Sequence, residues 1–451
     1  MIADHQSPGR DNFGSLLLAC SALLITSLFG AASLTGPLAW AVGLVYICYD
    51  TWLLSQMVRT SRRALRDQPF PQTPPPRPTV AVLIAARNEE AALPSSLDSL
   101  LAQDDPAEQV IVIDDGSTDG TLALLRERYP AVGVLSKAHS GKARSLNQAL
   151  PLCTSDLVVT LDADTILEPG ALAAVRRSFG LDAELTAACG VLTPVCQPGG
   201  LGPMFELYQT FEYLRSLLWR LAWSHEDTLV LVSGAFAIFR RPALLAVGGF
   251  DATSAVEDYE LLFRLHRRSL EGGQPLRVRV LGEARATTDV PARPLLFLRQ
   301  RRRWFAGFIE TMFRNRDMVG SRRFGRLGRF HLVVKTVDTL LPVYGLSAFL
   351  ALILLLLRGT GIPLAILLLL AAKFSFDFSC HVYCLFLYHR WQGRPVSVRF
   401  FARGALASLT EPYFFQFLRQ LGAVLGWIAF VRGRIEWGPE RPARSQEQAR
   451  G

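Results

Sequence analysis

The sequence contains neither of two glycine-rich signatures that bind nucleotides in many α/β enzymes. No Gly-x-Gly-x-x-Gly follows the first predicted strand at residues 80–86, which disfavours a dinucleotide-binding fold. No Gly-x-x-x-x-Gly-Lys-Ser/Thr loop occurs either, which disfavours a P-loop enzyme. Cysteine is scarce, and the seven cysteines, an odd number, give no disulfide framework. These absences argue against two nucleotide-binding classes and against a disulfide-stapled domain.

Charge is nearly absent from two long stretches near the N-terminus. Residues 13–34 and 38–57 are apolar over about 20 residues each, the length that crosses a bilayer core of ~30 Å. Only Thr35, Gly36 and Pro37 separate them, which favours a helical hairpin over a cleaved signal peptide. Arginines at positions 59, 62, 63 and 66 follow the second stretch and mark its cytoplasmic end. We therefore predict an N-terminal transmembrane hairpin over residues 1–66.

The C-terminal third is apolar again. Residues 332–357 and 362–388 have membrane length, and the basic residues after the latter indicate a return to the cytoplasm. Residues 405–431 contain Glu411, Pro412 and Arg419, so they fit either one crossing or a re-entrant pair. We predict C-terminal transmembrane helices over 331–435 and a tail over 436–451. The expected location is the inner (plasma) membrane, with several crossings and a cytoplasmic middle domain.

Charged residues inside and beside these runs have two interpretations each. Lys335 and Asp338, and Lys373 and Asp377, are three and four residues apart, so each pair can meet on one helix face. They could form a polar path through the membrane or simply neutralise each other. The net charge of +9 comes largely from arginines beside the apolar runs, which fits anionic lipid headgroups better than nucleic acid.

The middle of the chain has a different pattern. Six prolines between Asp67 and Thr79 predict a stiff linker over residues 67–78. Predicted strands at 80–86, 110–113, 132–135 and 157–164 then alternate with helices of about ten residues. This alternation predicts an α/β domain, over 79–292, with a parallel sheet covered on both faces and ligands at the strands' carboxyl ends. An amphipathic, basic stretch over 293–330 is typical of interfacial helices.

The strand at 157–164 ends in two carboxylates. Residues i and i+2 of an extended chain point the same way, so Asp162 and Asp164 are expected to face a common point. Hard oxygen ligands suit Mg²⁺ or Mn²⁺, which usually bind one or two carboxylates together with a substrate's phosphates. The alternative is that both aspartates open a solvated turn.

Six motifs in a fixed order carry a resemblance to a known family. They are Ala-Arg-Asn-Glu-Glu (86–90), Asp-Asp-Gly-Ser-Thr-Asp (114–119), Gly-Lys-Ala-Arg-Ser-Leu-Asn (141–147), Asp-Ala-Asp (162–164), Glu-Asp (257–258) and Gln-Arg-Arg-Arg-Trp (300–304). Over residues 80–304 the chain resembles family 2 glycosyltransferases of the membrane-embedded, processive type, similar to poly-N-acetylglucosamine, cellulose, chitin and hyaluronan synthases. The resemblance implies a GT-A type nucleotide-sugar-binding domain.

The resemblance also implies roles at the donor. Asp115 matches the aspartate that hydrogen-bonds the uracil ring, a role that suits an acceptor-only carboxylate. Glu89, Lys142 and Asp162 match donor-binding positions, and Asp164 with Asp162 matches the metal-binding pair. A cation at a helix start is locally unfavourable, so Lys142 indicates an anionic group close by. The bland alternatives are a turn-initiating Asp115 and a solvated Lys142.

Two further motifs are implied to act on the acceptor and the leaving group. Asp258, with Glu257, matches the catalytic base, although acids in a helix's first turn are stabilised there anyway. The family usually has Thr where this chain has Val256, so any hydrogen bond of that hydroxyl is lost. Gln300 and Arg303 match nucleotide-sugar-binding positions, with the arginine on the diphosphate, and Trp304 matches a residue that stacks on the acceptor sugar. The same arginines and tryptophan could instead anchor an interfacial helix.

We expect an inverting enzyme that transfers N-acetylglucosamine from a UDP-sugar and builds a β-linked exopolysaccharide. The alternative is a glycolipid synthase that transfers glucose from UDP-glucose to a lipid such as diacylglycerol. The expected partners are the donor, a polysaccharide or lipid acceptor, membrane lipids and accessory secretion subunits, with no nucleic acid. A dehalogenase-type phosphatase also uses Asp-x-Asp but wants Thr or Val where Ile166 stands. A non-catalytic transporter or sensor would tolerate loss of Asp258 or the metal pair, and all are present.

Overall fold

The computed structural model describes residues 19, 22, 37–66, 76–274, 276–357, 364–393 and 397–433. Contacts divide the chain into two units. The sheet unit runs from Thr60 to Arg293 and includes the end of α12 from Phe386. The helical unit holds the rest of α2 and α12, together with α10, α11, α13 and α14. The predicted run at 13–34 lies almost entirely outside the described residues.

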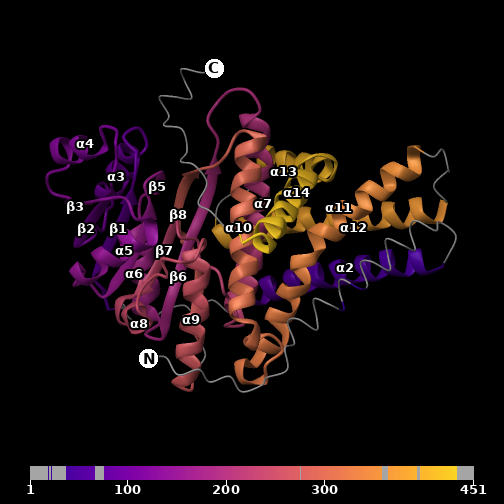
Figure 1. The fold of residues 1–451 in the computed structure, drawn as a ribbon, viewed down its shortest axis with the longest axis horizontal. Helices are drawn as coiled ribbons and strands as arrows, with labels where there is room; N and C mark the ends of the chain where they lie inside the picture. The colour runs from indigo at the N-terminus through magenta and orange to yellow at the C-terminus, as the bar shows by residue number, and fades with distance from the viewer. Residues whose placement is uncertain are drawn as a thin grey trace. The chain divides into compact units, whose positions relative to one another are not determined.

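The sheet unit contains eight described strands in the order β3-β2-β1-β4-β7-β6-β8-β5 (Figure 1). Their bounds are β1 Val80–Ala86, β2 Gln109–Asp115, β3 Gly133–Lys137, β4 Leu157–Asp162, β5 Thr165–Leu167, β6 Leu185–Val195, β7 Phe236–Arg240 and β8 Arg277–Asp289. The helices of this unit are α3 Leu93–Leu101, α4 Thr121–Arg128, α5 Lys142–Ala149, α6 Ala171–Leu181, α7 Gly202–His225, α8 Arg241–Ala246 and α9 Glu257–Glu271, with a single 3-10 turn at Leu150–Leu152.

The predicted parallel sheet is confirmed for only half of these strands. β3, β2, β1 and β4 are parallel, as alternating strands and helices require. β7 then pairs antiparallel with both β4 and β6, and β5 pairs antiparallel with β8, while β6 and β8 are parallel. The four strands predicted from the alternation, β1 to β4, are thus parallel as predicted, and the antiparallel pairings all involve strands beyond them. The sheet is therefore mixed.

Strand alternation divides the core into two layers. Val80, Val82 and Ile84 of β1 lie in one core, which also holds buried leucines of α3, α4 and α6. Ala81 and Leu83 lie in the other core, which holds buried residues of α5, α7, α8 and α9. Because β1 is apolar on both faces, the sheet is covered on both sides, as predicted.

The helical unit is built from α2 Pro37–Arg66, α10 Pro294–Arg314, α11 Leu332–Leu357, α12 Leu364–Gln392, α13 Val398–Thr410 and α14 Phe415–Val431, with single turns at Arg316–Met318, Arg322–Phe324, Leu327–His331 and Glu411–Tyr413. Helices are confirmed at 38–57 and 332–357, where the sequence predicted them. α10 packs on α14, where Phe297 and Phe415 lie 5.0 Å apart between ring centres. Gly422 and Gly426 permit close approach, because an added Cβ would lie within 3 Å of Arg301 and Phe305 respectively.

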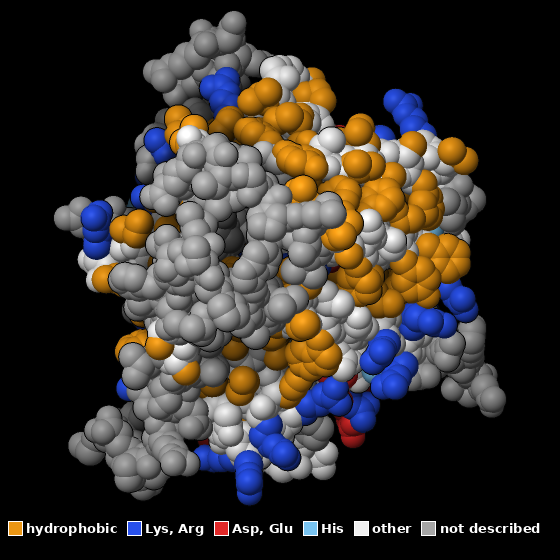
Figure 2. Space-filling view, turned by 90° about the vertical axis from the view of Figure 1, so that its right-hand side faces the viewer, with side chains coloured by type: hydrophobic (Ala, Val, Ile, Leu, Met, Phe, Trp, Pro, Cys, Tyr) orange, Lys and Arg blue, Asp and Glu red, His pale blue; other side chains and the backbone are white. Residues whose placement is uncertain are grey.

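Among the described residues, the segment Leu370–Gln392 is long and apolar enough to cross a membrane. Val398–Tyr413 and Phe415–Val431 pass the same test only as a pair bent by 55°, which fits a broken span or a re-entrant loop. Figure 2, which faces the right-hand side of Figure 1, shows hydrophobic side chains gathered over part of that face, with Lys and Arg side chains beside them. Exposed apolar residues of the helical unit include Leu357, Leu368, Val398, Tyr413 and Val431.

Charged residues within the apolar helices are paired. The predicted pairs are confirmed: Lys335 lies 3.5 Å from Asp338, and Lys373 contacts Asp377. Lys373 also lies 2.7 Å from Asp50 of α2, a partner that helical spacing could not reveal. These pairs neutralise charges that would otherwise be costly beside apolar side chains.

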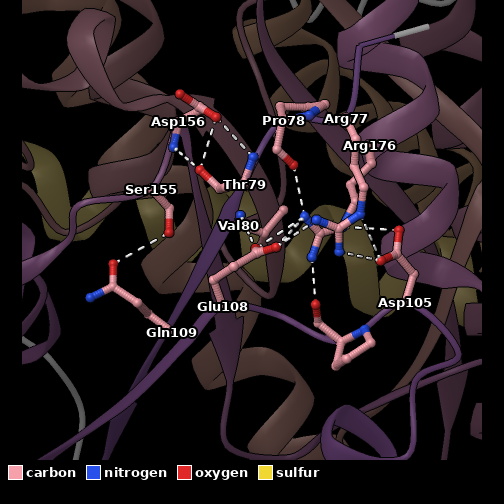
Figure 3. A network of polar contacts seen from close by, with 11 residues as sticks. Arg77, Pro78, Thr79, Val80, Asp105, Glu108, Gln109, Ser155, Asp156 and Arg176 are labelled. Atoms are coloured by element: carbon pink, nitrogen blue, oxygen red, sulfur yellow. Dashed lines mark hydrogen bonds and ion pairs between the residues drawn. The ribbon is translucent and has the colours of Figure 1, made fainter.

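A buried arginine fixes the chain where it enters the sheet (Figure 3). Arg176 of α6 donates to the carbonyl oxygens of Pro78 and Pro106 and pairs with Glu108 at 3.0 Å. Burial raises the pKa of Glu108, but the N–H of Val80, Arg176 and other donors outweigh it and lower that pKa to about 2. The start of β1 is thereby tied to α6 and to the segment before β2.

We expect Arg176→Met to destabilise the protein by about 3–5 kcal/mol, because it leaves two part-buried carbonyl oxygens and a carboxylate without their buried partner. The matched control is Arg177→Met, since Arg177 is half exposed and pairs with the exposed Glu283. That change should cost about 0–1 kcal/mol. Chemical unfolding of the purified full-length variants gives both values. Equal losses in the free energy of unfolding would mean that the network around Arg176 stabilises the protein no more than the surface pair does.

Candidate active site

Two acids predicted from the sequence lie at one edge of the sheet. β2 ends at Asp115 and β4 ends at Asp162, and both strands run parallel to β1 between them. The expectation that both acids lie at the strands' carboxyl ends is confirmed. Parallel α/β sheets bind ligands at this edge, because loops and helix N-termini converge there.

The loops that follow β1 and β2 are joined by hydrogen bonds. The Asn88 N–H donates to Ser117 Oγ at 3.0 Å, and the Thr118 N–H donates to Asn88 Oδ1 at 2.8 Å. Asn88 adopts a left-handed conformation, with φ of 55°, which asparagine tolerates better than most residues. The Glu89 N–H donates to Thr121 Oγ1 at 2.9 Å, so the half-buried Glu89 also lies in this pair of loops.

The carboxylate of Asp115 holds the loop between β3 and α5. Its two oxygens accept the N–H groups of Ser140 and Gly141, at 2.9 and 2.8 Å, and contact Lys137 Nζ and His139 Nδ1. Burial raises the pKa of Asp115, but these donors outweigh it and lower that pKa to about 2. His139 is half exposed, whereas the Lys137 side chain is only 11% exposed. His139 is therefore the more accessible of these two side-chain partners.

Lys142 joins acids from two motifs that are far apart in the sequence. Its ammonium group contacts Asp162 at the end of β4 and lies 3.5 Å from Glu257 at the start of α9. Burial alone would lower the pKa of Lys142, but the charges of Asp162, Glu257 and Asp258 outweigh it and raise that pKa. The sequence indicated an anionic group near this helix start, and the protein's own carboxylates are such groups.

Gly234 connects the Lys142 cation to Asp258. Its N–H donates to Asp258 Oδ2 at 2.8 Å, and its carbonyl oxygen accepts from Lys142 Nζ at 3.3 Å. An added Cβ would lie 3.2 Å from Asp258 Oδ2 and 3.3 Å from Lys142 Nζ, so a larger residue would crowd both. Sequence reasoning missed Gly234. The available signal was a glycine just before the apolar run 235–239, a pattern that indicates close approach of another group.

The Asp-Ala-Asp segment differs from the expectation in one respect. β4 ends at Asp162, and Ala163 and Asp164 form a turn before β5. The alternation argument for a common direction is therefore wrong, because it requires an extended chain. Asp164 instead accepts a hydrogen bond from Thr288 Oγ1 of β8 at 3.2 Å. Thr288 was missed because nothing in the sequence shows that β5 pairs with β8.

Gln300, Arg303 and Trp304 lie on α10, in the helical unit. Beside them, Arg301 stacks on the rings of Phe297 and Trp304, with its guanidinium carbon 4.6 Å from each ring centre. Trp304 thus takes part in an aromatic and cationic cluster on its own helix. The roles of these three residues at the site stay predictions.

The residues present fit a divalent ion that is shared with a substrate. Within the described ranges, no group of three or more His, Cys, Asp or Glu could hold a metal ion by itself. Asp162 and Asp164 provide hard oxygen ligands, and the Asp162 side chain is 37% exposed. Mg²⁺ and ions like it are commonly bound by one or two carboxylates plus substrate phosphates rather than by a full protein cage. The donor set suits that mode of binding.

A family model decides the classification. The model described as "Glycosyltransferase like family 2" matches residues 75–307, slightly more than half of the chain. The chain belongs to this family. The match includes every site residue described above, from the loops after β1 and β2 to α10. The predicted membership is confirmed.

Similar proteins include glycosyltransferases that make a polysaccharide. The poly-beta-1,6-N-acetyl-D-glucosamine synthase of Staphylococcus aureus is 28% identical over 270 residues, which cover 59% of this chain and 62% of that protein. The synthase of Staphylococcus epidermidis is 25% identical over 276 residues, covering 60% and 64%. The chain thus spans less than two thirds of the curated relatives it matches.

A solved structure supports the fold. A mannosyltransferase from Pyrobaculum calidifontis, determined in complex with GDP-Man and Mn²⁺, superposes with a TM-score of 0.53 at 22% identity. The superposition covers 88% of this chain and 99% of that one. The GT-A-like α/β core of this glycosyltransferase family member is therefore shared with a known glycosyltransferase structure.

The lowered pKa of Asp115 predicts acid sensitivity. The pKa of Asp115 is about 2 in the folded protein, below its ordinary value of 3.8. Ionised Asp115 therefore stabilises the fold, and this stabilisation is complete at pH values well above 3.8. The stabilisation, roughly 2 kcal/mol, is lost as pH falls toward 2. The free energy of unfolding of the parent should therefore drop more between pH 7 and pH 3 than that of Asp115→Asn. Parallel pH curves for the two proteins would contradict this role.

Proposed function

We propose that this protein is an inverting glycosyltransferase that transfers a sugar from a UDP-sugar to a hydroxyl acceptor at the membrane. The observation that carries the proposal is the convergence on Lys142 of Asp162, at the end of β4, and Glu257, at the start of α9. Asp258, the assigned base, follows Glu257 and is linked to the same lysine through Gly234, so the acids assigned to the diphosphate and to the base lie around one cation. N-acetylglucosamine is the preferred donor sugar, because the curated relatives are poly-beta-1,6-N-acetyl-D-glucosamine synthases.

The donor's nucleotide is assigned to the edge formed by Asp115 and the loop it holds. A uracil N–H can take the place of His139, the half-exposed partner, on Asp115 Oδ2. Ser140 and Gly141 keep the carboxylate in position during this exchange. Glu89 lies in the neighbouring pair of loops and is assigned to the same end of the donor.

The diphosphate is assigned to Asp162, Asp164 and Lys142. Asp162 and Asp164 would hold Mg²⁺ or Mn²⁺, which supplies positive charge to the leaving diphosphate when bound. Lys142 provides a second cation beside Asp162 and is steadied by the Gly234 carbonyl oxygen. Gln300 and Arg303 of α10 are assigned to the same diphosphate, because arginine pairs bidentately with phosphate, and Trp304 to the acceptor sugar.

Asp258 is assigned as the base that removes the proton of the acceptor hydroxyl. The N–H of Gly234 fixes its Oδ2 at 2.8 Å, and the N–H of Tyr259 fixes its Oδ1 at 2.9 Å. Each oxygen keeps a lone pair that can accept the proton. Attack of the hydroxyl on the anomeric carbon then breaks the bond to the diphosphate, with inversion and no covalent intermediate. Glu257, buried against Lys142, balances the cation's charge.

A polymer is the preferred product, and a glycolipid is the alternative. The relatives' names favour the polymer. Exposed apolar residues of α12 to α14 are proposed to contact membrane lipids, so that a polysaccharide or lipid acceptor is bound at the membrane. The location is proposed to be the inner membrane with a cytoplasmic sheet unit, served by accessory secretion subunits.

Incubating membranes that contain the full-length protein with labelled UDP-N-acetylglucosamine, UDP-glucose and GDP-mannose tests this function. We expect label from UDP-N-acetylglucosamine in material that lipid solvents do not extract. Chelator, or Asp164→Ala, should abolish transfer and metal-dependent UDP binding together. Label in the lipid extract from UDP-glucose would establish the glycolipid alternative. Full transfer in chelator would contradict the assignment of a metal.

Asp258→Asn separates a base from a helix-capping acid. A general base contributes about 10²- to 10⁴-fold to the rate, so UDP release should fall by that factor while UDP affinity is unchanged. The matched control is Glu271→Gln, at the exposed end of the same helix, which should leave both quantities unchanged. Normal turnover in Asp258→Asn would mean that another group is the base.

A further inference from the structure

Two consecutive glycines form the turn that leads toward α9. Gly248 and Gly249 have φ of 79° and 73°, a left-handed conformation that other residues adopt only with strain. Their N–H groups donate to the carbonyl oxygens of Leu245 and Leu244, at 3.0 Å each, and close the end of α8. Such a pattern is typical of a helix C-terminus. The turn therefore has one fixed shape.

Asn147 of α5 binds the residue that follows these glycines. Its Nδ2 donates to the Phe250 carbonyl oxygen at 2.7 Å, and the Phe250 N–H donates to its Oδ1 at 2.8 Å. One side-chain amide thus satisfies both backbone groups of one residue, as a neighbouring strand would. A Cβ on Gly249 would lie only 2.4 Å from Asn147 Oδ1, so this contact requires glycine at position 249.

The segment from Phe250 to α9 is held by further contacts. Phe250 is buried and meets Phe239 of β7 edge-on, with ring centres 6.1 Å apart. The N–H groups of Thr253 and Val256 donate to the side chains of Asp251 and Ser254, at 2.8 and 3.2 Å. A displacement at Phe250 is therefore carried through ordered turns to the first residues of α9.

The same short helix holds both ends of this arrangement. α5 begins with Lys142, which faces Asp162, Glu257 and Asp258, and it carries Asn147 five residues later. We propose that Asn147 is a positioning residue, which sets the start of α9 relative to Lys142 and so holds Asp258 at its working distance. This inference rests on the proposed function, in which Asp258 is the base. In this arrangement α5, which carries Lys142, sets the position of α9, which carries Asp258.

Asn147→Ala and Asn147→Asp test the proposal in the full-length protein. The aspartate keeps the shape of asparagine but sets a carboxylate against the Phe250 carbonyl oxygen. Misplacement by about 1 Å can cost about 10²-fold in rate, so we expect kcat to fall roughly 10- to 100-fold per folded molecule. The KM for the UDP-sugar should stay near that of the parent, because Asn147 does not touch the donor. Gln148→Ala, at the exposed neighbouring position, is the control and should change neither constant.

Gly249→Ala supplies an independent variant in which Asn147 itself is not substituted. Its added Cβ should displace Asn147 and lower kcat in the same way. The double variant with Asn147→Ala should lose no more than the worse of the two single variants, because both disturb one contact. Multiplying losses in kcat would show that the two residues act separately and would overturn the proposal. So would a loss of thermal stability with unchanged kcat, the result expected of a purely structural tie.

Asp258→Asn, assayed alongside, separates the positioning role of Asn147 from the proposed role of Asp258 as the base. An inactive Asp258→Asn with a normal kcat in Asn147→Ala would refute the positioning role alone. A fully active Asp258→Asn would refute the proposed base and with it the reason for positioning α9. Loss of kcat in Asn147→Ala, Asn147→Asp and Gly249→Ala, with KM preserved, supports both.

Discussion

The geometry of the site depends on one partly buried ammonium group. Lys142 lies among three oxygen groups, the carboxylates of Asp162 and Glu257 and the carbonyl oxygen of Gly234, and each of them is negative or partly negative. Without a cation, Asp162, Glu257 and Asp258 would repel one another at short range in a partly buried setting. Lys142 thus makes it possible for the fold to concentrate acids there. The proposed reaction requires such a cluster of acids, because it uses carboxylates both to hold a cation at the leaving diphosphate and to act as the base.

The first part of the sheet and much of the site could be predicted from the sequence, because parallel strands all have their carboxyl ends at the same edge of a sheet. Apolar runs ending in acids predicted Asp115 and Asp162 at one edge, and both lie there. The rule fails at β7, which is antiparallel to β4. In such a strand it is the residue before the strand, not after it, that reaches this edge. Gly234 precedes β7, so it lay outside any search of strand ends.

Side-chain partners were less predictable than backbone positions. The motif around Lys142 was visible, but the contacts of Asn147 and Thr288 join segments about a hundred residues or more apart. Such pairings depend on how turns place the chain, and those turns rely on glycines with positive φ. Short-range patterns also failed for Asp164, because a two-residue turn, Ala163 and Asp164, follows the end of the strand. Long-range pairing and local breaks in regular structure are the two features that periodicity does not record.

The sheet unit is discontinuous along the chain, and this affects how it could be isolated. Ser61, at the end of α2, donates to the Leu218 carbonyl oxygen of α7. Trp391, at the end of α12, covers Gly282, and Arg285 donates to the Gln392 carbonyl oxygen. A fragment cut at Thr79 and at residue 292, the limits that composition suggests, would lack these contacts and the Pro78 carbonyl oxygen bound by Arg176. It would expose an apolar strand surface and leave a buried guanidinium short of an acceptor, so a soluble catalytic fragment should keep the end of α2 and include the end of α12.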